Sequence, residues 1–486
     1  MNHRPALAPS PAVTGNRRSS VADAITAFST SLSFDDLPGA AIDAAKRSIL
    51  DTLAVAVAGT RSRAGRSALK AFAAHADGGP ATVLGTPLRA HPSIAALVNG
   101  TMAHALDFDD VWADDDGVVA WRGHPSVCVL PAVLAAGEAE GCDGATALLA
   151  YVIGVEIAGK LGTAFGPHLG RAGFHPTPIV GTLATAAAVA RVLGVDRERA
   201  NAMLGLAATE ASGLCRNFGT DTKPFHAGHA AQAGLQATLL AREGFTANPE
   251  AVTDYLKLHH GPEDADAVAV LGTLGKLYDI VAPGLSIKKY PCCRFTHLPL
   301  DAMFMLLEQE RFDASDLEAL TIRIQPGADD ALIYKEPRTG LEGKFSMEYT
   351  LAAAMLDGRV TLASFTDEMV LRPEVRALMK RVRTEYKPEP GAEAVACTPR
   401  GEYRALATVV RGDPANPLSW DEILQKCHQC LEGIVSAECV DRLVDAVKRL
   451  EQLPDVRHLT GLLRAEPAVN GSRSPLCRAR AARAPP

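Results

Sequence analysis

The residues best suited to acid–base chemistry gather in the stretch 104–126. An alanine-rich apolar segment ends there in Asp107 and Asp109, and after a loop His124 opens the next apolar segment. A carboxylate and an imidazole at adjoining helix ends can move a proton to or from a substrate. The same stretch also suits a metal site or a solvated loop, and the additional acids Asp114 to Asp116 add weight to those alternatives.

Three later motifs supply basic residues. GFHPT places His175 directly before a proline-initiated helix, where anions gather at the N-terminus. NFGTDTKPFHAGH brings Lys223 and His226 into what reads as a turn between helices, where a lysine before proline is held extended and can point into a cleft. IKKYPCCRFTH places Lys288 where the helical pattern gives way to a mixed one, so it should face an interdomain cleft. Each residue alone also suits a capping or surface role.

Taken together, these residues favour a substrate with several carboxylates. Lys223, Lys288 and His175 form a cationic set, and Asp107 and His124 form an acid–base pair. Loss of water, CO2 or a proton next to a carboxylate passes through an enolate-like state, which lysines stabilise while histidine or aspartate moves the proton. This chemistry requires no metal and no other cofactor.

Three other functions fit parts of the sequence. DDVWADDD resembles the Mg²⁺-diphosphate motif of helical isoprenoid synthases, but no second acidic motif follows and only 5% of the residues are aromatic. An iron–sulfur hydratase needs three well-placed cysteines, and Cys427, Cys430 and Cys439 fall within expected helices. A non-catalytic helical scaffold is the third alternative.

Helices must position most of these side chains. Apolar periodicity predicts helices over 22–32, 41–58, 65–74, 127–140, 145–161, 179–193, 197–211 and 227–243. The small residues of 179–193 predict a central, closely packed helix. Asp51 falls in the middle of the second helix and is expected to face solvent.

The pattern changes after residue 284. Alternation predicts strands over 317–324 and 403–410, with helices over 345–356 and 373–382 between them. The sequence therefore predicts a mainly α protein with a large helical domain (20–284) and a smaller α+β lid (285–411). Helices in 412–465 should pack back on the helical domain, and the tails 1–19 and 466–486 are expected to be disordered.

Composition restricts the partners and the compartment. A net charge of −7 over 486 residues argues against a nucleic-acid partner. Ten scattered cysteines suit a reducing, cytoplasmic location, and the first 20 residues have no apolar core of a signal peptide. The longest apolar run, 179–190, is too short to span a membrane.

Six motifs in order resemble those of the MmgE/PrpD family, which includes 2-methylcitrate dehydratase, cis-aconitate decarboxylase and iminodisuccinate epimerase. The resemblance runs from about residue 20 to 465 and rests on HALDFDD, GHPS, GFHPT, GTDTKPFHAGHAA, IKKYPCC and FSMEYTLAAAMLDG. It implies a large helical domain with an α+β lid, a homodimer, and activity without a metal or an iron–sulfur cluster.

The resemblance also implies a set of site residues. Active-site roles fall on Asp107, His124, His175, Lys223, Lys288 and Tyr349. Our hypothesis is that both lysines, with His175 and His226, bind a small polycarboxylate and that His124, oriented by Asp107, transfers the proton. Dehydration, decarboxylation and epimerisation all stay open, because Val111 and Cys293 differ from the residues expected of the decarboxylases.

Overall fold

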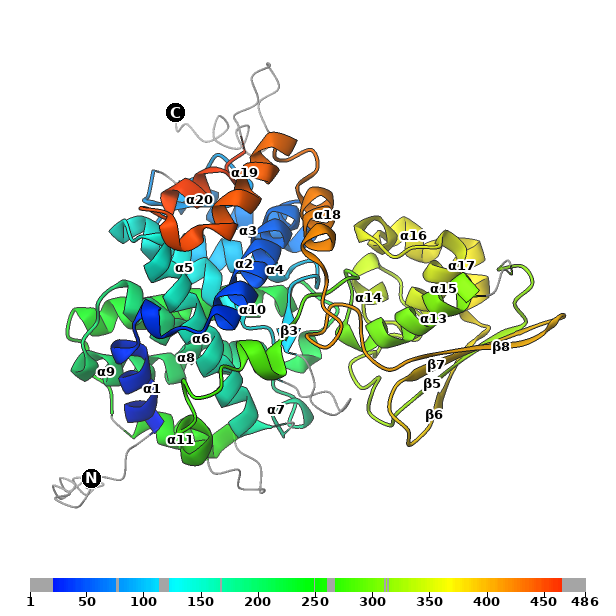
Figure 1. Ribbon diagram of the computed structural model, residues 1–486, viewed down its shortest axis with the longest axis horizontal. Helices are drawn as coiled ribbons and strands as arrows, with labels where there is room; N and C mark the ends of the chain where they lie inside the picture. Colours follow the sequence, from blue (N-terminus) through cyan, green and yellow to red (C-terminus); the bar gives the residue numbers. More distant parts are fainter. Residues whose placement is uncertain are drawn as a thin grey trace, which may run out of the picture.

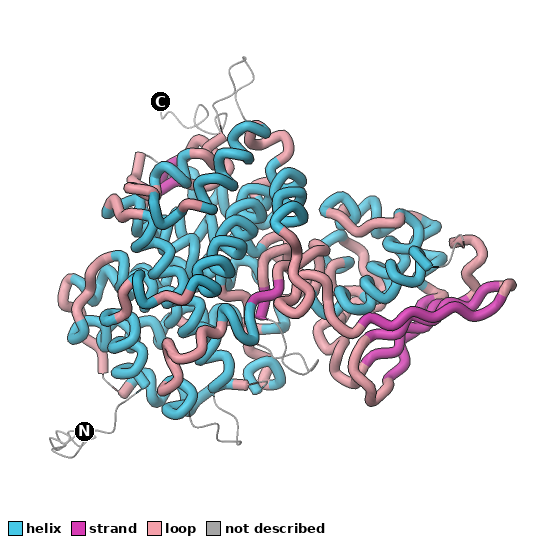
Figure 2. The backbone as a smooth tube through the Cα atoms, viewed as in Figure 1, coloured by secondary structure: helices cyan, strands magenta, loops and turns pink. Residues whose placement is uncertain are grey.

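The computed structural model describes residues 21–75, 78–112, 122–166, 168–248, 250–259, 267–309, 312 and 314–465. The tails predicted to be disordered and the acids Asp114 to Asp116 lie outside these residues. Most of the described chain is helical, and one four-stranded sheet lies in the C-terminal part (Figure 2). The predicted fold class, mainly α with a smaller α+β part, is confirmed.

The larger part is a body of helices (Figure 1) with one large apolar core and a second, smaller one. Its helices are α1 (Val21–Ser31), α2 (Gly39–Gly59), α3 (Arg63–Phe72), α4 (Pro92–His104), α5 (Ser126–Glu140), α6 (Gly144–Phe165), α7 (His168–Arg171), α8 (Pro176–Val192), α9 (Arg197–Glu210), α10 (Thr222–Arg242), α11 (Ala251–His259) and α12 (Ala267–Leu271). Two short ribbons accompany them, β1 (Ala81–Thr82) with β2 (Arg89–Ala90), and β3 (Val111–Trp112) with β4 (Leu285–Ser286).

Small residues let the central helices of the body approach closely. Helix α10 packs against α4 and α8, and α8 packs against α6. A Cβ added at Gly228 of α10 would lie 2.2 Å from the carbonyl oxygen of Leu97 in α4. The first 15 residues of α8, up to Ala190, are buried, as expected for a central helix. Helix α6 is long and apolar enough to cross a membrane, yet 94% of its most apolar window is buried in the protein, which is the behaviour of a core helix.

The smaller part has its own core, formed by one sheet and the helices on one face of it (Figure 1). The strand order is β6-β5-β7-β8, with β5 parallel to β6 and the other pairs antiparallel. The elements are α13 (His297–Gln309), β5 (Ala319–Ile324), α14 (Gly340–Gly343), α15 (Met347–Asp357), α16 (Asp367–Leu371), α17 (Pro373–Met379), β6 (Val382–Tyr386), β7 (Ala392–Thr398) and β8 (Gly401–Ala407).

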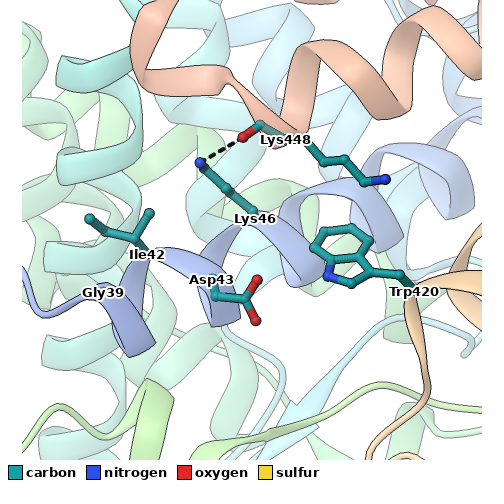
Figure 3. A pocket seen from close by; sticks show the side chains of 6 residues that line it. All are labelled: Gly39, Ile42, Asp43, Lys46, Trp420 and Lys448. Carbon is teal, nitrogen blue, oxygen red and sulfur yellow. Dashed lines mark hydrogen bonds between the residues drawn. The ribbon is translucent and has the colours of Figure 1, made fainter.

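The last helices return to the body. They are α18 (Trp420–Leu431), α19 (Ala437–Lys448) and α20 (Arg457–Gly461), and α18 and α19 pack against α2. Figure 3 shows one of these contacts, in which Lys46 of α2 donates to the backbone oxygen of Lys448 at 2.7 Å. The residue boundaries expected for the domains stay predictions.

Two expectations about single elements are wrong. Asp51 does not face solvent: it is fully buried and forms an ion pair with Lys426 of α18 at 2.6 Å. The helix expected over 373–382 ends at Met379, and strand β6 begins at Val382. In both places a long-range partner, which periodicity does not register, decides the structure.

Candidate functional site

A cavity of about 70 Å³ is lined by most of the predicted site residues. Asp107, His124, His175, Lys223 and Lys288 all line it, although they lie on five separate segments of the chain. Ligand pockets usually measure ~300–1,000 Å³, so this cavity is narrow for a polycarboxylate. Walls come from both parts of the molecule, including Phe345 of the α+β part.

Asp107 is held at the centre of this site by two lysines. Its Oδ1 accepts hydrogen bonds from Lys223 Nζ at 2.7 Å and from Lys288 Nζ at 3.0 Å. Lys223 lies in the first turn of α10, and Lys288 follows β4, whose pairing with β3 brings it beside the 107–110 segment. Within the described residues Asp107 Oδ2 is buried and has no hydrogen-bond partner, so it is available to a substrate.

The charges around Asp107 keep it ionised. Burial alone would raise the pKa of Asp107, but Lys223 and Lys288 outweigh that effect and hold the pKa well below its usual range. Burial would lower the pKa of Lys288, and the Asp107 carboxylate raises it above its usual value. The centre of the site is therefore a carboxylate flanked by buried ammonium groups.

His124 is oriented by Asp109 and by the backbone of Asp110, which corrects our hypothesis that Asp107 orients it. Asp109 Oδ2 lies 2.8 Å from His124 Nδ1, and the backbone oxygen of Asp110 lies 2.9 Å from the same nitrogen. Both Asp109 oxygens also lie 3.1 Å from His104 Nδ1. The reason is geometric: Asp107 turns toward the lysines, and Asp109, two residues later, turns toward the histidines. With Nδ1 of His124 directed at the carboxylate, Nε2 is the ring nitrogen left for proton transfer.

Burial and neighbouring charges also shift the pKa values of the groups around His124. Burial would raise the pKa of Asp109, but His104 and His124 hold it well below its usual range. Burial lowers the pKa of His104 to about 4. Asp109 is thus an anion at neutral pH, and His104 is a neutral ring beside it.

His175 and His226 form a second imidazole pair. Their Nδ1 atoms lie 3.1 Å apart, and the His175 ring stacks on the His104 ring with centroids 5.9 Å apart. Burial lowers the pKa of His175 well below its usual value and that of His226 to about 4. Both rings are therefore neutral near pH 7. His226 lies behind His175 and does not line the cavity.

One expectation about the position of site residues needs correction, and one further predicted site residue lies outside the cavity. Lys223 and His226 lie in the first two turns of α10, not in a turn before it, because Pro224 is tolerated in a first helical turn. Tyr349 does not line the cavity. Its ring is buried in the smaller core, and its hydroxyl donates to the backbone oxygen of Ser364.

The structure also brings in residues that we did not predict as site residues. His104 and Asp109 complete the hydrogen-bonded cluster, and Arg294 lines the cavity with a buried Nε that has no hydrogen-bond partner within the described residues. Arg294 is otherwise fixed by Asp413, whose Oδ2 lies 2.6 Å from its Nη2. His104 could have been found from its position at the end of an apolar helix, five residues before Asp109; Arg294 offered no comparable signal.

A metal ion fits this site poorly for electrostatic reasons. Among the described residues, one group of potential ligands lies close enough together, namely His104, Asp107, Asp109 and His124. Lys223 and Lys288 already supply two positive charges to Asp107, and a dication placed beside them would be repelled. Cys427, Cys430 and Cys439 do not form such a group.

Comparison with known proteins gives matches over most of the chain. The model of the MmgE/PrpD N-terminal domain matches residues 23–257, and that of the MmgE/PrpD C-terminal domain matches residues 290–452. The chain is 30% identical to the cis-aconitate decarboxylase of Homo sapiens, over 90% of this chain and 93% of that protein. The cis-aconitate decarboxylase of Mus musculus is 29% identical, over 94% and 96%. The 2-methylcitrate dehydratase of Escherichia coli is 26% identical, over 62% and 64%.

Proposed function

The chain belongs to the MmgE/PrpD family and is a lyase of the carboxy-lyase or hydro-lyase type, and on this premise we propose that it removes CO2 from a small tricarboxylate such as cis-aconitate. We propose further that the reaction uses no metal and no other cofactor. The cis-aconitate decarboxylases that it resembles match over about nine-tenths of both chains, whereas the dehydratase matches over less than two-thirds. That difference in coverage favours decarboxylation.

One observation carries the proposal: a carboxylate held between two buried ammonium groups faces the same cavity as an imidazole oriented by a second carboxylate. Lys223, Lys288 and Arg294 supply positive charge for the substrate carboxylates. When the bond to the departing carboxylate breaks, CO2 leaves and the electron pair spreads toward a remaining carboxylate. These cations stabilise that charge.

His124 completes the reaction in this proposal. The carbanion that remains after CO2 departs must gain one proton, and His124 Nε2 donates it while Asp109 stabilises the imidazolium form. His124 then recovers a proton from solvent. His175, neutral and adjacent, is placed to bind the substrate or to act as a second acid–base group.

Dehydration of 2-methylcitrate is the second candidate. Val111 and Cys293 both line the cavity, and these are the positions at which the sequence differs from the residues expected of decarboxylases. The same groups would serve a dehydratase: a base removes a proton next to a carboxylate, and the hydroxide leaves with a proton from an acid. Epimerisation of iminodisuccinate is a third use of the same proton transfer.

One experiment separates these reactions and tests the proposal. Purified protein is incubated separately with cis-aconitate, 2-methylcitrate, citrate and iminodisuccinate, and each mixture is followed by NMR. We expect loss of cis-aconitate with release of one CO2 per molecule. Conversion of 2-methylcitrate alone would replace the first candidate by the second, and turnover of none of the four would leave a non-catalytic scaffold.

Two broader features are also proposals. The resemblance to the family supports a homodimer, which light scattering of the purified protein will test. The scattered cysteines support a cytoplasmic location, which fractionation of the source cells will test.

A further inference from the structure

Three consecutive backbone oxygens around Asp107 each accept a hydrogen bond from a different buried lysine. Leu106 O receives Lys344 Nζ at 2.6 Å, Asp107 O receives Lys288 Nζ at 3.0 Å, and Phe108 O receives Lys426 Nζ at 2.7 Å. All three lysines are at most 5% exposed. Of these, Lys288 belongs to the site already described, whereas Lys344 and Lys426 do not line the cavity.

The two outer lysines also bind the segment that carries Lys288. Lys426 Nζ donates to Lys288 O at 2.9 Å, and Lys344 Nζ donates to the backbone oxygen of Pro291. Each ammonium group therefore joins the 106–108 segment to the 288–291 segment, one on each side of the Asp107–Lys288 contact. We call Lys344 and Lys426 the lysine clamp.

The backbone at this point needs external support. Asp107 has φ = 51°, and it is the one non-glycine residue with positive φ among the described parts of the chain. A left-handed conformation is unfavourable for a residue with a Cβ, so surrounding contacts must hold it. The lysines that supply them come from distant places: Lys344 follows α14 in the α+β part, and Lys426 lies in α18.

Each clamp lysine has further partners in its buried position. Lys426 has Asp51 as counter-ion at 2.6 Å and lies 3.8 Å from the Phe108 ring centroid. Lys344 lies 4.4 Å from the Phe365 ring centroid, and burial lowers its pKa to about 8. Buried charged lysines are costly, and here that cost is offset by four bonds to two backbone segments.

We infer that Lys344 and Lys426 are positioning residues, which fix the left-handed backbone at Asp107 and the spacing between the Asp107 carboxylate and Lys288. Neither lysine touches the substrate. The clamp makes the geometry of the site depend on contacts from α18 and from the α+β part. This inference rests on the proposed function for its kinetic readout only.

Lys344→Met and Lys426→Met test the clamp, because methionine fills similar space without donating. The matched control is Lys46→Met: Lys46 is also a buried lysine that donates to a backbone oxygen and pairs with an acid, Glu451, but at the α2–α19 contact (Figure 3). Two quantities are measured on the full-length folded protein: kcat and KM for the compound that the wild type consumes, and amide hydrogen exchange of peptides covering 104–112.

Both clamp variants should lose kcat by roughly 10²-fold, as expected when a catalytic group is displaced by about 1 Å. Exchange in 104–112 should become faster, and KM should change less than kcat. Lys46→Met should leave kcat and exchange in 104–112 at wild-type values even if it lowers the melting temperature. Wild-type kcat in folded clamp variants, unchanged exchange in 104–112, or an equal kcat loss in Lys46→Met would each overturn the inference.

A second variant covers the case in which the methionine variants fail to fold. Asp51→Asn keeps the side-chain size and removes the counter-ion of Lys426, and it should speed exchange in 104–112 and lower kcat by roughly tenfold; wild-type values for both would overturn the clamp. If the wild type consumes none of the four compounds, the proposed function fails by itself. In that case the amide hydrogen-exchange measurements alone test the inference about the lysine clamp.

Discussion

Asp109 contacts two imidazoles, His104 and His124, through the Nδ1 atom of each ring. An ionised carboxylate only accepts, so it holds Nδ1 of His124 protonated and stabilises the imidazolium form. The side chain of Asp110, the next residue, has a different partner. It accepts from Ser126 Oγ at 2.5 Å, and burial raises its pKa to about 7.

Asp109→Asn should lower kcat by roughly 10²- to 10⁴-fold, because an amide does not stabilise the imidazolium form as a carboxylate does. The matched control is Asp110→Asn, which replaces an acid already partly neutral near pH 7 and should retain most of the activity. Steady-state kinetics on both variants, with circular dichroism to confirm folding, is the measurement. Equal losses in the two variants would contradict the assignment of Asp109.

Asp107→Asn should destabilise the protein at neutral pH. It leaves the ammonium groups of Lys223 and Lys288 buried without their counter-ion, at a cost of about 3–5 kcal/mol. The pKa of Asp107 is depressed in the folded state, so its stabilisation is complete above the ordinary value of 3.8 and disappears as the pH falls through the folded-state pKa.

Urea unfolding at a series of pH values measures this effect. The difference between wild type and Asp107→Asn should be largest at pH 7 and should shrink below pH 4. Asp43→Asn, at an exposed pair with Arg47, serves as control and should change the free energy of unfolding by no more than about 0.5 kcal/mol. A difference that grows on acidification would contradict the ion pairs around Asp107.

At the scale of single residues, the sequence could indicate chemistry but not contacts. Acid, imidazole and lysine types at helix ends pointed to Asp107, His124, His175, Lys223 and Lys288, and the structure places all five around one cavity. The sequence could not show that Asp109 contacts His124, because two aspartates only two residues apart cannot be distinguished before the backbone conformation is known. Asp107 differs from Asp109 in its left-handed backbone conformation, which no local sequence pattern predicted.

Helix α10 carries both Lys223 and His226, and its close approach to α4 fixes where they lie. Gly228 makes that approach possible. Gly228→Ala should destabilise the protein by about 1–3 kcal/mol or more, because the added Cβ meets backbone and the helices must move apart. Activity should also fall, because Lys223 moves when the helices separate.

The control for this substitution is Gly39→Ala at the start of α2, where an added Cβ has nothing within 4 Å. It should be neutral or slightly stabilising, since alanine favours helix over glycine. Chemical denaturation and kcat are measured for both proteins. A Gly228→Ala variant as stable and active as Gly39→Ala would show that the α4–α10 distance does not position the site.

At the scale of elements, most helices of the body followed from apolar periodicity, and those expected agree with the described ones to within a few residues. The shorter helices α7, α11 and α12 were not predicted. Strands β6 and β7 were not predicted. β7 is central, with a burial pattern that does not alternate, and β6 is an exposed edge strand rich in charge. Both exist because β5 pairs with them, and pairing partners cannot be read from a short segment.

At the scale of the whole molecule, a small cavity lies between the helical body and the α+β part. Lysines supply in it the positive charge that a metal would otherwise bring. Prolonged dialysis against EDTA should therefore leave kcat unchanged. Activity is compared before and after dialysis and after separate additions of Mg²⁺, Zn²⁺ and Fe²⁺. Lost activity that one of these ions restores would show that His104, Asp107, Asp109 and His124 bind a metal.

The arrangement of the whole chain was predictable only through its resemblance to a family. The six ordered motifs implied a helical part and an α+β part, and the resemblance placed acidic, histidine, lysine and tyrosine residues of these motifs in one site. Nothing in composition or spacing joins Lys344 to Leu106 or Lys426 to Phe108, which are 238 and 318 residues apart. Contacts at such separations depend on how complete domains pack.

The central claim is that His124 moves a proton in this cavity. The measurement is NMR in D2O on the compound that the wild type consumes, with wild-type protein and His124→Ala side by side. For decarboxylation, the wild type should release CO2 and place one deuterium in each product molecule. His124→Ala should give no turnover while keeping the wild-type melting temperature. Near-normal turnover by a folded His124→Ala would contradict the account.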